Sequence, residues 1–142
     1  MSKTIETEVI IHASPEKIWK ILTDFESYTT WNPFIKSIQG VVEIGNQIQV
    51  NIEPKDGKGM TFKPVVLSKK NAQELSWLGK LLIKGIFDGE HKFELSDNGN
   101  GTTKFVQSEK FSGLLVPFFN FDSTAAGFNA MNQKLKELAE RS

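Results

Sequence analysis

Cysteine is absent from the 142-residue sequence, tyrosine occurs once and histidine twice. Without cysteine the chain can form no disulfide, no thiolate zinc site and no thiol nucleophile. The two histidines, His12 and His91, are far apart in the sequence, which argues against a transition-metal centre. The 17 basic and 17 acidic residues cancel to a net charge of zero without basic blocks, which argues against nucleic acid or an anionic membrane as the main partner. We therefore predict no metal or other cofactor and no nucleic-acid partner.

Long apolar runs are also missing. No uninterrupted apolar stretch approaches the roughly 20 residues that a membrane-spanning helix requires. The polar N-terminal residues 1–6 do not resemble a signal peptide. We therefore expect a cytoplasmic protein without integral membrane association, as a monomer or weak homodimer. The length favours a single domain over residues 1–142, large enough for a core and an internal cavity.

Hydrophobic periodicity predicts which segments form strands and which form helices. Residues 3–12 alternate as in a half-buried strand, and Ser14 and Pro15 then suit the N-cap and first position of a helix. Asp24 is placed to start a second short turn through Tyr28, and we expect a loop at 31–33. After Pro117 the period becomes helical, which predicts a long amphipathic helix from 118 or 120 to about 140.

Between the helical segments the period is two, interrupted by turn residues. The connections are too short for parallel crossovers, so the strands should pair antiparallel. Segregated strands and helices predict an α+β fold in which the long helix lies against one face of the sheet. The predicted strands after the first cover residues 35–44, 48–52, 60–67, 74–79, 86–95 and 102–111, with turn clusters at 55–59 and 97–101.

Several local patterns occur in an order that points to a known family. They are IHASPEKIW at 11–19, Phe25 and Tyr28 before WNP at 31–33, ELSW at 74–77, GEHKFEL at 89–95, GTT at 101–103, QSEKFSG at 107–113 and the helical segment 128–139. Together they resemble the START-like (SRPBCC) superfamily and, within it, the polyketide cyclase/dehydrase-like branch. The resemblance implies a helix-grip fold: about seven antiparallel strands in a curved sheet around the long C-terminal helix, two short helices after the first strand, and an internal cavity. The superfamily includes aromatase/cyclases, lipid carriers and chaperone activators, so the fold leaves the function open.

Strand alternation predicts which polar side chains face such a cavity. On 87–95 the charged residues belong outside, so His91 points inward, and on 103–111 Gln107 and Glu109 share the inner face with phenylalanines. A His and a Glu in an apolar pocket can act as general acid and base in a proton abstraction. They can equally be hydrogen-bonded groups that orient a ligand. Both roles are open for His91 and Glu109.

Aromatic residues supply most of the other candidates. Trp31 and Asn32 suit either the pocket entrance or packing of the short helices, and the apolar run 114–119 suits either a gate or a buried corner. The candidate ligand-binding residues are Trp31, Asn32, Phe62, Trp77, Phe87, His91, Phe93, Phe105, Gln107, Glu109, Phe118, Phe121, Ala125 and Phe128.

The eleven phenylalanines and three tryptophans, with few polar residues among them on the inner faces, favour binding of a small, mostly apolar ligand of aromatic, lipid-like or polyketide-like type. Two alternatives stay open. One is an aromatase/cyclase- or dehydratase-type enzyme that uses His91 and Glu109 as acid and base, and the other is a protein-interaction module of the chaperone-activator type.

Overall fold

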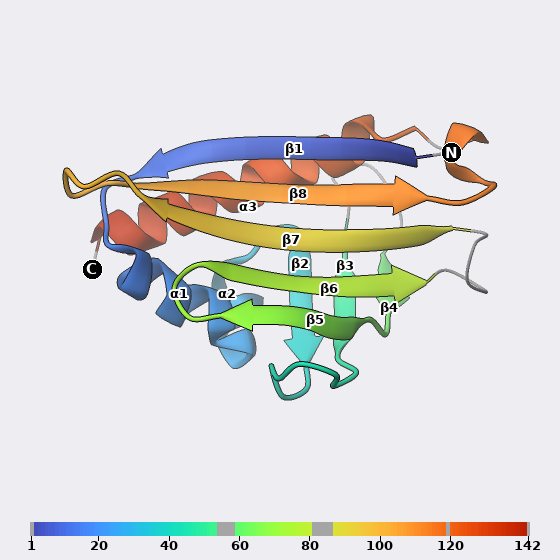
Figure 1. Ribbon diagram of the computed structural model, residues 1–142, viewed down its shortest axis with the longest axis horizontal. Coiled ribbons are helices and arrows are strands. Elements are labelled where there is room, and N and C mark those ends of the chain that lie inside the picture. Colours follow the sequence, from blue (N-terminus) through green and yellow to red (C-terminus); the bar gives the residue numbers. More distant parts are fainter. Residues whose placement is uncertain (1, 54–58, 81–86, 119, 142) are drawn as a thin grey trace.

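The computed structural model describes residues 2–53, 59–80, 87–118 and 120–141. Its strands form two antiparallel sheets (Figure 1). The larger sheet contains, in spatial order, β1 (Ser2–Ile11), β8 (Thr103–Ser112), β7 (Asp88–Asp97), β6 (Glu74–Lys80) and β5 (Val65–Lys70). The smaller sheet contains β2 (Ile35–Gln39), β3 (Gln49–Ile52) and β4 (Met60–Phe62). Of the turn predicted at 55–59, only Gly59 belongs to the described residues. Ile86, the first residue of the strand predicted at 86–95, lies outside them.

The two sheets arise because one predicted strand is interrupted. The segment predicted as 60–67 divides at Pro64, which has no backbone N–H to donate to a sheet. Met60–Phe62 pairs with β3, whereas Val65–Lys70 pairs with β6. The isolated bridge between Gln47 and Val65 still joins the two sheets at this point. The result is a curved antiparallel wall, as predicted, in two parts.

The helices follow the predicted order. They are α1 (Pro15–Thr23), the 3-10 turn η1 (Phe25–Ser27), α2 (Tyr28–Trp31), the 3-10 turn η2 (Val116–Phe118) and α3 (Asp122–Arg141). The Ser14 hydroxyl accepts a hydrogen bond from the backbone N–H of Lys17, which confirms the predicted N-cap. Trp31 was expected in a loop but is the last residue of α2, where the backbone N–H of Asn32 still donates to the Tyr28 carbonyl.

A buried tyrosine fixes the short helices to one another. The hydroxyl of Tyr28 donates to the carbonyl of Leu22 near the end of α1, and both residues are fully buried. Burial, together with the charge of Asp24, raises the pKa of Tyr28 well above its ordinary value. The hydroxyl therefore stays protonated and remains a donor, which satisfies a carbonyl that the helix end leaves free.

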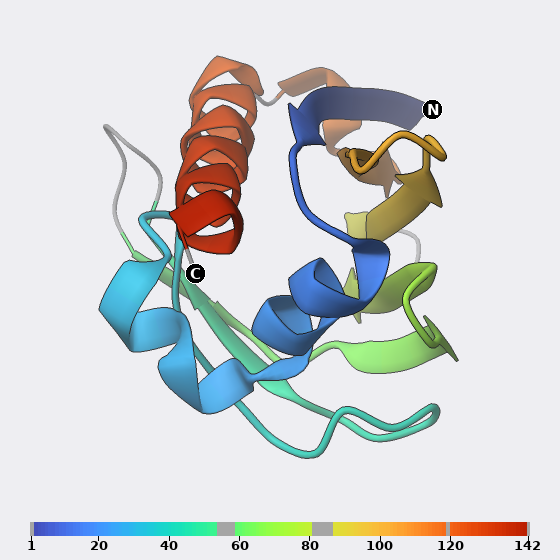
Figure 2. The same cartoon turned by 90° about the vertical axis from the view of Figure 1, so that its left-hand side faces the viewer.

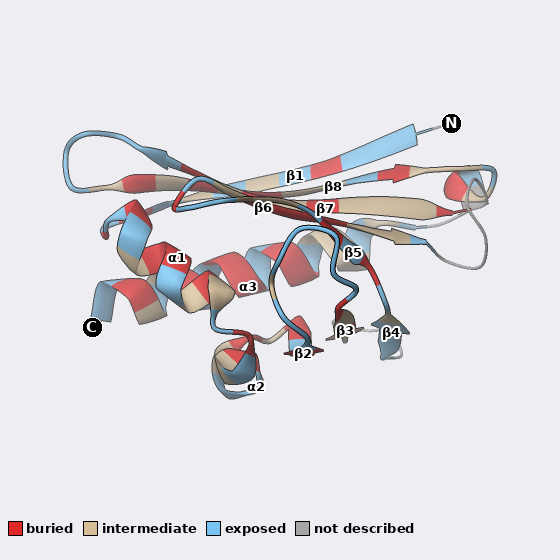
Figure 3. Cartoon of the chain, turned by 60° about the horizontal axis from the view of Figure 1, so that its bottom comes forward, coloured by how far each residue is buried: buried red, intermediate tan, exposed pale blue. Residues whose placement is uncertain are grey.

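The sheets curve around one face of α3, which confirms the predicted α+β helix-grip architecture (Figure 2). The buried face of α3 consists of Gly127, Phe128, Met131, Asn132, Leu135 and Ala139. Phe93 and Phe105 lie stacked on the inner face of β7 and β8 and are fully buried. Figure 3 shows buried and exposed residues alternating around α1 and α3, as the amphipathic patterns predict. None of the helices that the structure describes has the length and apolar character needed to cross a membrane.

Glu140, near the end of α3, ties the helix to the segment that leaves β1. Its Oε2 atom accepts hydrogen bonds from the backbone N–H of His12 at 2.8 Å and from Lys136 Nζ at 2.6 Å. The backbone N–H of His12, followed by the Lys136 ammonium, lowers the pKa of Glu140 from 4.5 to about 2. Because the pKa is lower in the folded state, the ionised carboxylate stabilises the fold above about pH 4.5, and this contribution is lost as the pH falls to about 2.

We therefore expect Glu140→Gln to be less stable than the wild type at pH 6, and the difference to disappear near pH 2. Equilibrium urea unfolding at a series of pH values measures it. Glu137→Gln removes one charge from the same helix and controls for the change in net charge. A difference between Glu140→Gln and wild type that stayed constant from pH 6 to pH 2 would contradict this role of the carboxylate.

Candidate functional site

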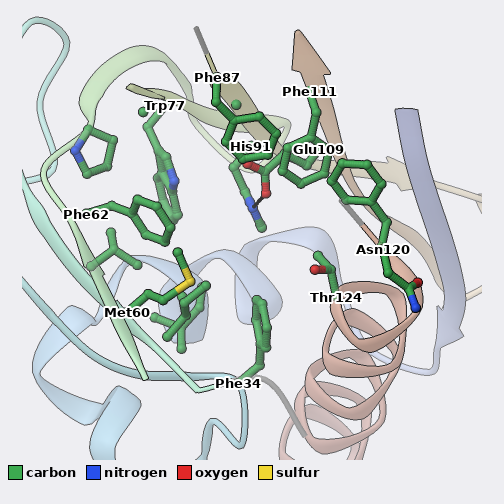
Figure 4. A pocket seen from close by; sticks show the side chains of 17 residues that line it. Phe34, Met60, Phe62, Trp77, Phe87, His91, Glu109, Phe111, Asn120 and Thr124 are labelled. Atoms are coloured by element: carbon green, nitrogen blue, oxygen red, sulfur yellow. Dashed lines mark hydrogen bonds and ion pairs between the residues drawn. The ribbon is translucent and has the colours of Figure 1, made fainter. Parts of the chain in front are cut away.

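A cavity of about 140 Å³ lies between the two sheets and the N-terminal end of α3 (Figure 4). Its wall is mainly aromatic and aliphatic. The lining residues that the structure describes are Phe34, Ile35, Val50, Ile52, Met60, Phe62, Pro64, Trp77, Gly79, Phe87, Gly89, His91, Glu109, Phe111, Asn120, Phe121 and Thr124. The larger sheet and the residues around the start of α3 form one side, and the smaller sheet forms the other.

Aromatic rings pack against one another around the cavity. Phe111 lies 4.5 Å from Phe121 and 5.6 Å from Phe87, measured between ring centroids. The indole of Trp77 stacks on the imidazole of His91, with centroids 5.2 Å apart and planes 15° apart. These contacts hold flat apolar surfaces in fixed positions and suit a flat apolar ligand.

One chain of hydrogen bonds runs from the cavity into the core. Glu109 Oε1 lies 3.0 Å from His91 Nδ1, and His91 Nε2 lies 2.9 Å from Gln107 Oε1. Gln107 Nε2 donates to Asn132 Oδ1 at 2.8 Å, and Asn132 Nδ2 donates to the Thr7 hydroxyl at 2.8 Å. The Thr7 hydroxyl then donates to the backbone carbonyl of Gln107. The chain links β1, β7, β8 and α3 around a single imidazole.

The backbone carbonyls in this network determine where the imidazole carries its proton. The Gln107 amide also donates to the Phe128 carbonyl at 3.4 Å, and a carbonyl oxygen can only accept. The Gln107 Oε1 atom therefore faces His91 Nε2 as an acceptor, so Nε2 carries a hydrogen. The other contact, between His91 Nδ1 and Glu109, is favourable only when the pair holds one further proton, on the imidazole or on the carboxyl. This proton can lie on either His91 Nδ1 or Glu109 Oε1, and these two atoms are 3.0 Å apart.

Gly89, on the neighbouring strand β7, makes room for the carboxylate of Glu109. A Cβ atom on Gly89 would lie 2.2 Å from Glu109 Oε2, closer than any real contact, so only glycine leaves Oε2 in its place. The Glu109 side chain is 18% exposed, compared with 5% for His91. Both side chains line the cavity, and Glu109 is the more exposed of the two, whereas both ring nitrogens of His91 are engaged by protein groups.

Six of the predicted site residues line the cavity: Phe62, Trp77, Phe87, His91, Glu109 and Phe121. Others lie one layer further in. Gln107 holds His91 from behind, and the ring of Phe128 packs edge-on against the imidazole at 5.0 Å. Phe93 and Phe105 belong to the closed core, and half-buried Ala125 packs against it outside the described lining. The side chain of Phe118 lies outside the described part of the chain.

Trp31 and Asn32 lie away from the described lining and have structural contacts instead. Asn32 Oδ1 accepts hydrogen bonds from the backbone N–H groups of Phe34 and Ile35, both at 2.9 Å. The Trp31 ring packs edge-on against Tyr28 at 5.3 Å. This pair fixes the start of β2 and so places Phe34, which does line the cavity.

The smaller sheet supplies lining residues that were not among the predicted site residues. Val50 and Ile52 on β3, and Met60 on β4, close the cavity from the side opposite His91. The alternation of apolar residues at 48, 50 and 52 was a usable signal for an inner face. Gly89 and Thr124 carried no comparable signal, because their importance depends on what lies opposite them in the fold.

Comparison with known proteins gives a match over almost the whole chain. A family model described as polyketide cyclase/dehydrase and lipid transport matches residues 2–142. No curated protein matches the sequence closely enough to count as a relative.

Solved structures share the fold at low sequence identity. A START superfamily protein from Mycobacterium smegmatis has a TM-score of 0.74 at 22% identity, over 97% of each chain. An aromatase/cyclase from a Streptomyces species has a TM-score of 0.75 at 15% identity, over 99% of this chain and 95% of the other. The ginseng (Panax ginseng) major latex-like protein 151 has a TM-score of 0.80 at 10% identity, over 97% of each chain. At these identities the likeness concerns the fold.

Proposed function

Because the chain belongs to the polyketide cyclase/dehydrase and lipid transport family, we propose that its cavity binds a small, mostly apolar ligand between the sheets and α3. The observation that carries the proposal is the cavity itself, with stacked aromatic rings on its wall and one ionisable pair, His91 and Glu109, among its described lining. An apolar cavity with a few convergent polar groups is the usual form of a small-molecule site. A cavity of roughly 150 Å³ lined by apolar side chains accommodates benzene, so the volume here suits a ligand with one aromatic ring.

A catalytic role is the second candidate, and the His91–Glu109 contact favours it. The two groups can exchange one proton over 3.0 Å, and the partly exposed Glu109 side chain lines the cavity. In such a reaction Glu109 would be the catalytic residue, since it can contact a bound molecule. His91 would be a positioning residue that supplies or removes the proton from behind. An acid–base step of this kind suits a cyclase or dehydratase.

Thermal unfolding in the presence of ethylbenzene tests the binding proposal. Binding to the folded state alone stabilises it by RT ln(1 + [L]/Kd), so we expect the midpoint to rise with ligand concentration. Ile52→Phe, which places a larger side chain in the cavity wall, should abolish the rise. Leu67→Phe adds the same bulk on the exposed side of β5 and should preserve it.

Native mass spectrometry of the purified protein then separates the two candidate functions. A bound molecule recovered unchanged after incubation supports a binding protein, and a recovered molecule of altered mass supports an enzyme. A midpoint that did not respond to any one-ring aromatic, with no co-purifying molecule, would contradict the proposed cavity function.

A further inference from the structure

One polar atom on the cavity wall has no donor in the part of the chain that the structure describes. Glu109 uses Oε1 to contact His91 Nδ1 at 3.0 Å, while Oε2 lies over Gly89 and has no protein partner there. Oε2 is not sealed into the core, because the Glu109 side chain is 18% exposed and lines the cavity. A carboxylate oxygen with free lone pairs in a mainly apolar wall needs a donor from water or from a ligand.

The protonation of the pair does not change what Oε2 offers. When the shared proton is on His91, Oε2 belongs to a carboxylate and accepts. When the proton is on Glu109 Oε1 and donated to Nδ1, Oε2 is the carbonyl oxygen of a carboxylic acid and still accepts. In both states the cavity presents an acceptor at this point.

The rest of the described wall, which includes the polar side chains of Asn120 and Thr124, offers no cationic side chain to hold an anion. None of the described lining residues is lysine or arginine. A ligand carboxylate placed at the polar end would face Glu109 without a compensating cation, which is strongly unfavourable in an apolar site. A fully charged ammonium would lose its hydration in a mainly apolar cavity whose one described carboxylate already contacts His91, which is also unfavourable.

We propose that the cavity selects a small aromatic molecule with a neutral, hydrogen-bond-donating head group of the phenol type, and that Glu109 Oε2 accepts this hydrogen bond. The inference rests on the proposed function, because it concerns the same cavity. It adds the class of ligand and the atom that recognises its head group. The aromatic ring lies among Trp77, Phe87 and Phe111, and the hydroxyl reaches the space left by Gly89.

Isothermal titration calorimetry at pH 7 with three one-ring probes tests this selection. The probes are 4-ethylphenol, its isosteric analogue 1-ethyl-4-fluorobenzene, which cannot donate, and 4-ethylbenzoate, which is an anion. Phenols of this type are neutral at pH 7. We expect the phenol to bind at least tenfold more tightly than the fluoro analogue, and the benzoate to bind most weakly.

Two variants assign the preference to Glu109 Oε2. Glu109→Leu removes the acceptor, so the phenol and the fluoro analogue should bind within about twofold of each other. Gly89→Ala keeps the carboxylate but places a methyl group 2.2 Å from the position of Oε2, which forces it to move and should also remove the preference. Glu90→Gln, on the opposite face of β7, is the matched control and should keep the full preference. Gly89→Ala decides the question on its own where Glu109→Leu does not fold.

The outcomes separate this inference from the proposed function. Equal binding of the phenol and the fluoro analogue to the wild type, or tightest binding of the benzoate, overturns the inference and leaves the cavity function standing. A phenol preference that persists in Gly89→Ala or Glu109→Leu overturns the assignment to Oε2. Failure of all three probes to bind overturns both proposals.

Discussion

Gln107→Leu is expected to lower the free energy of unfolding by about 3 kcal/mol, although leucine has nearly the same volume as glutamine. Gln107 is fully buried and connects His91 on one side to Asn132 on the other. Leucine leaves the His91 Nε2–H group and the Asn132 Oδ1 atom buried without partners, and each unsatisfied group costs roughly 1–3 kcal/mol. Equilibrium urea unfolding followed by tryptophan fluorescence measures the loss.

Ser108→Ala provides the control for this substitution, because Ser108 is on the same strand and points to the other face. It should change the stability by less than about 0.5 kcal/mol. The double variant Gln107→Leu/Asn132→Leu tests the network itself, since removing both partners leaves fewer orphaned groups than the two single variants predict. A loss below about 1 kcal/mol in Gln107→Leu, or strict additivity in the double variant, would show that the hydrogen-bond chain does not stabilise the fold as we describe.

Local alternation was enough to place this network on the inner sheet face. The period of two along β7 and β8 puts His91 and Gln107 inside, because Glu90 and Lys92 belong in water. In the structure His91 and Gln107 are both buried. The register could not be read from the sequence. The predicted turn at 97–101 leaves open which residue of β8 faces His91, and in the structure His91 is paired with Glu109. The backbone N–H of Asn98 donates to the Thr102 carbonyl, which centres the turn at position 100 and sets this pairing.

Features that depend on the approach of distant segments could not be read from the sequence. Asn32 suited either the pocket entrance or packing of the short helices, and the sequence did not show that its side chain caps the backbone of Phe34 and Ile35. The predicted strand divides at Pro64, but which strand each half pairs with is decided by tertiary packing. Gly127 is the strongest example, because its neighbour in space is 93 positions away and nothing in the helical pattern indicates it.

Gly127→Ala is expected to destabilise the protein by about 2 kcal/mol, against the usual effect of this exchange in a helix. Alanine in place of a helical glycine normally gains up to about 1 kcal/mol. Here the added Cβ would lie 2.2 Å from Cδ1 and 2.6 Å from Cε1 of Phe34, inside any possible contact distance. The Phe34 ring is itself packed edge-on against Phe128 at 5.5 Å, so it cannot swing away without disturbing the core. Overpacking of this kind typically costs 1–3 kcal/mol.

The neighbouring helix position and the opposing ring provide the controls. Ala126→Gly, on the exposed side of α3, should lose about 1 kcal/mol from helix propensity alone, so alanine and glycine should rank in opposite orders at the two positions. In a Phe34→Val background the ring atoms that clash are gone, and Gly127→Ala should then cost nothing or stabilise. Urea unfolding of the wild type, Gly127→Ala, Phe34→Val and the double variant measures the coupling between the two positions.

Because Phe34 also lines the cavity, Gly127→Ala should weaken ethylbenzene binding in the otherwise wild-type chain. A Gly127→Ala variant that is more stable than the wild type would show that Phe34 moves away from α3 readily. It would also show that the contact with Gly127 does not fix the position of Phe34 in the cavity wall.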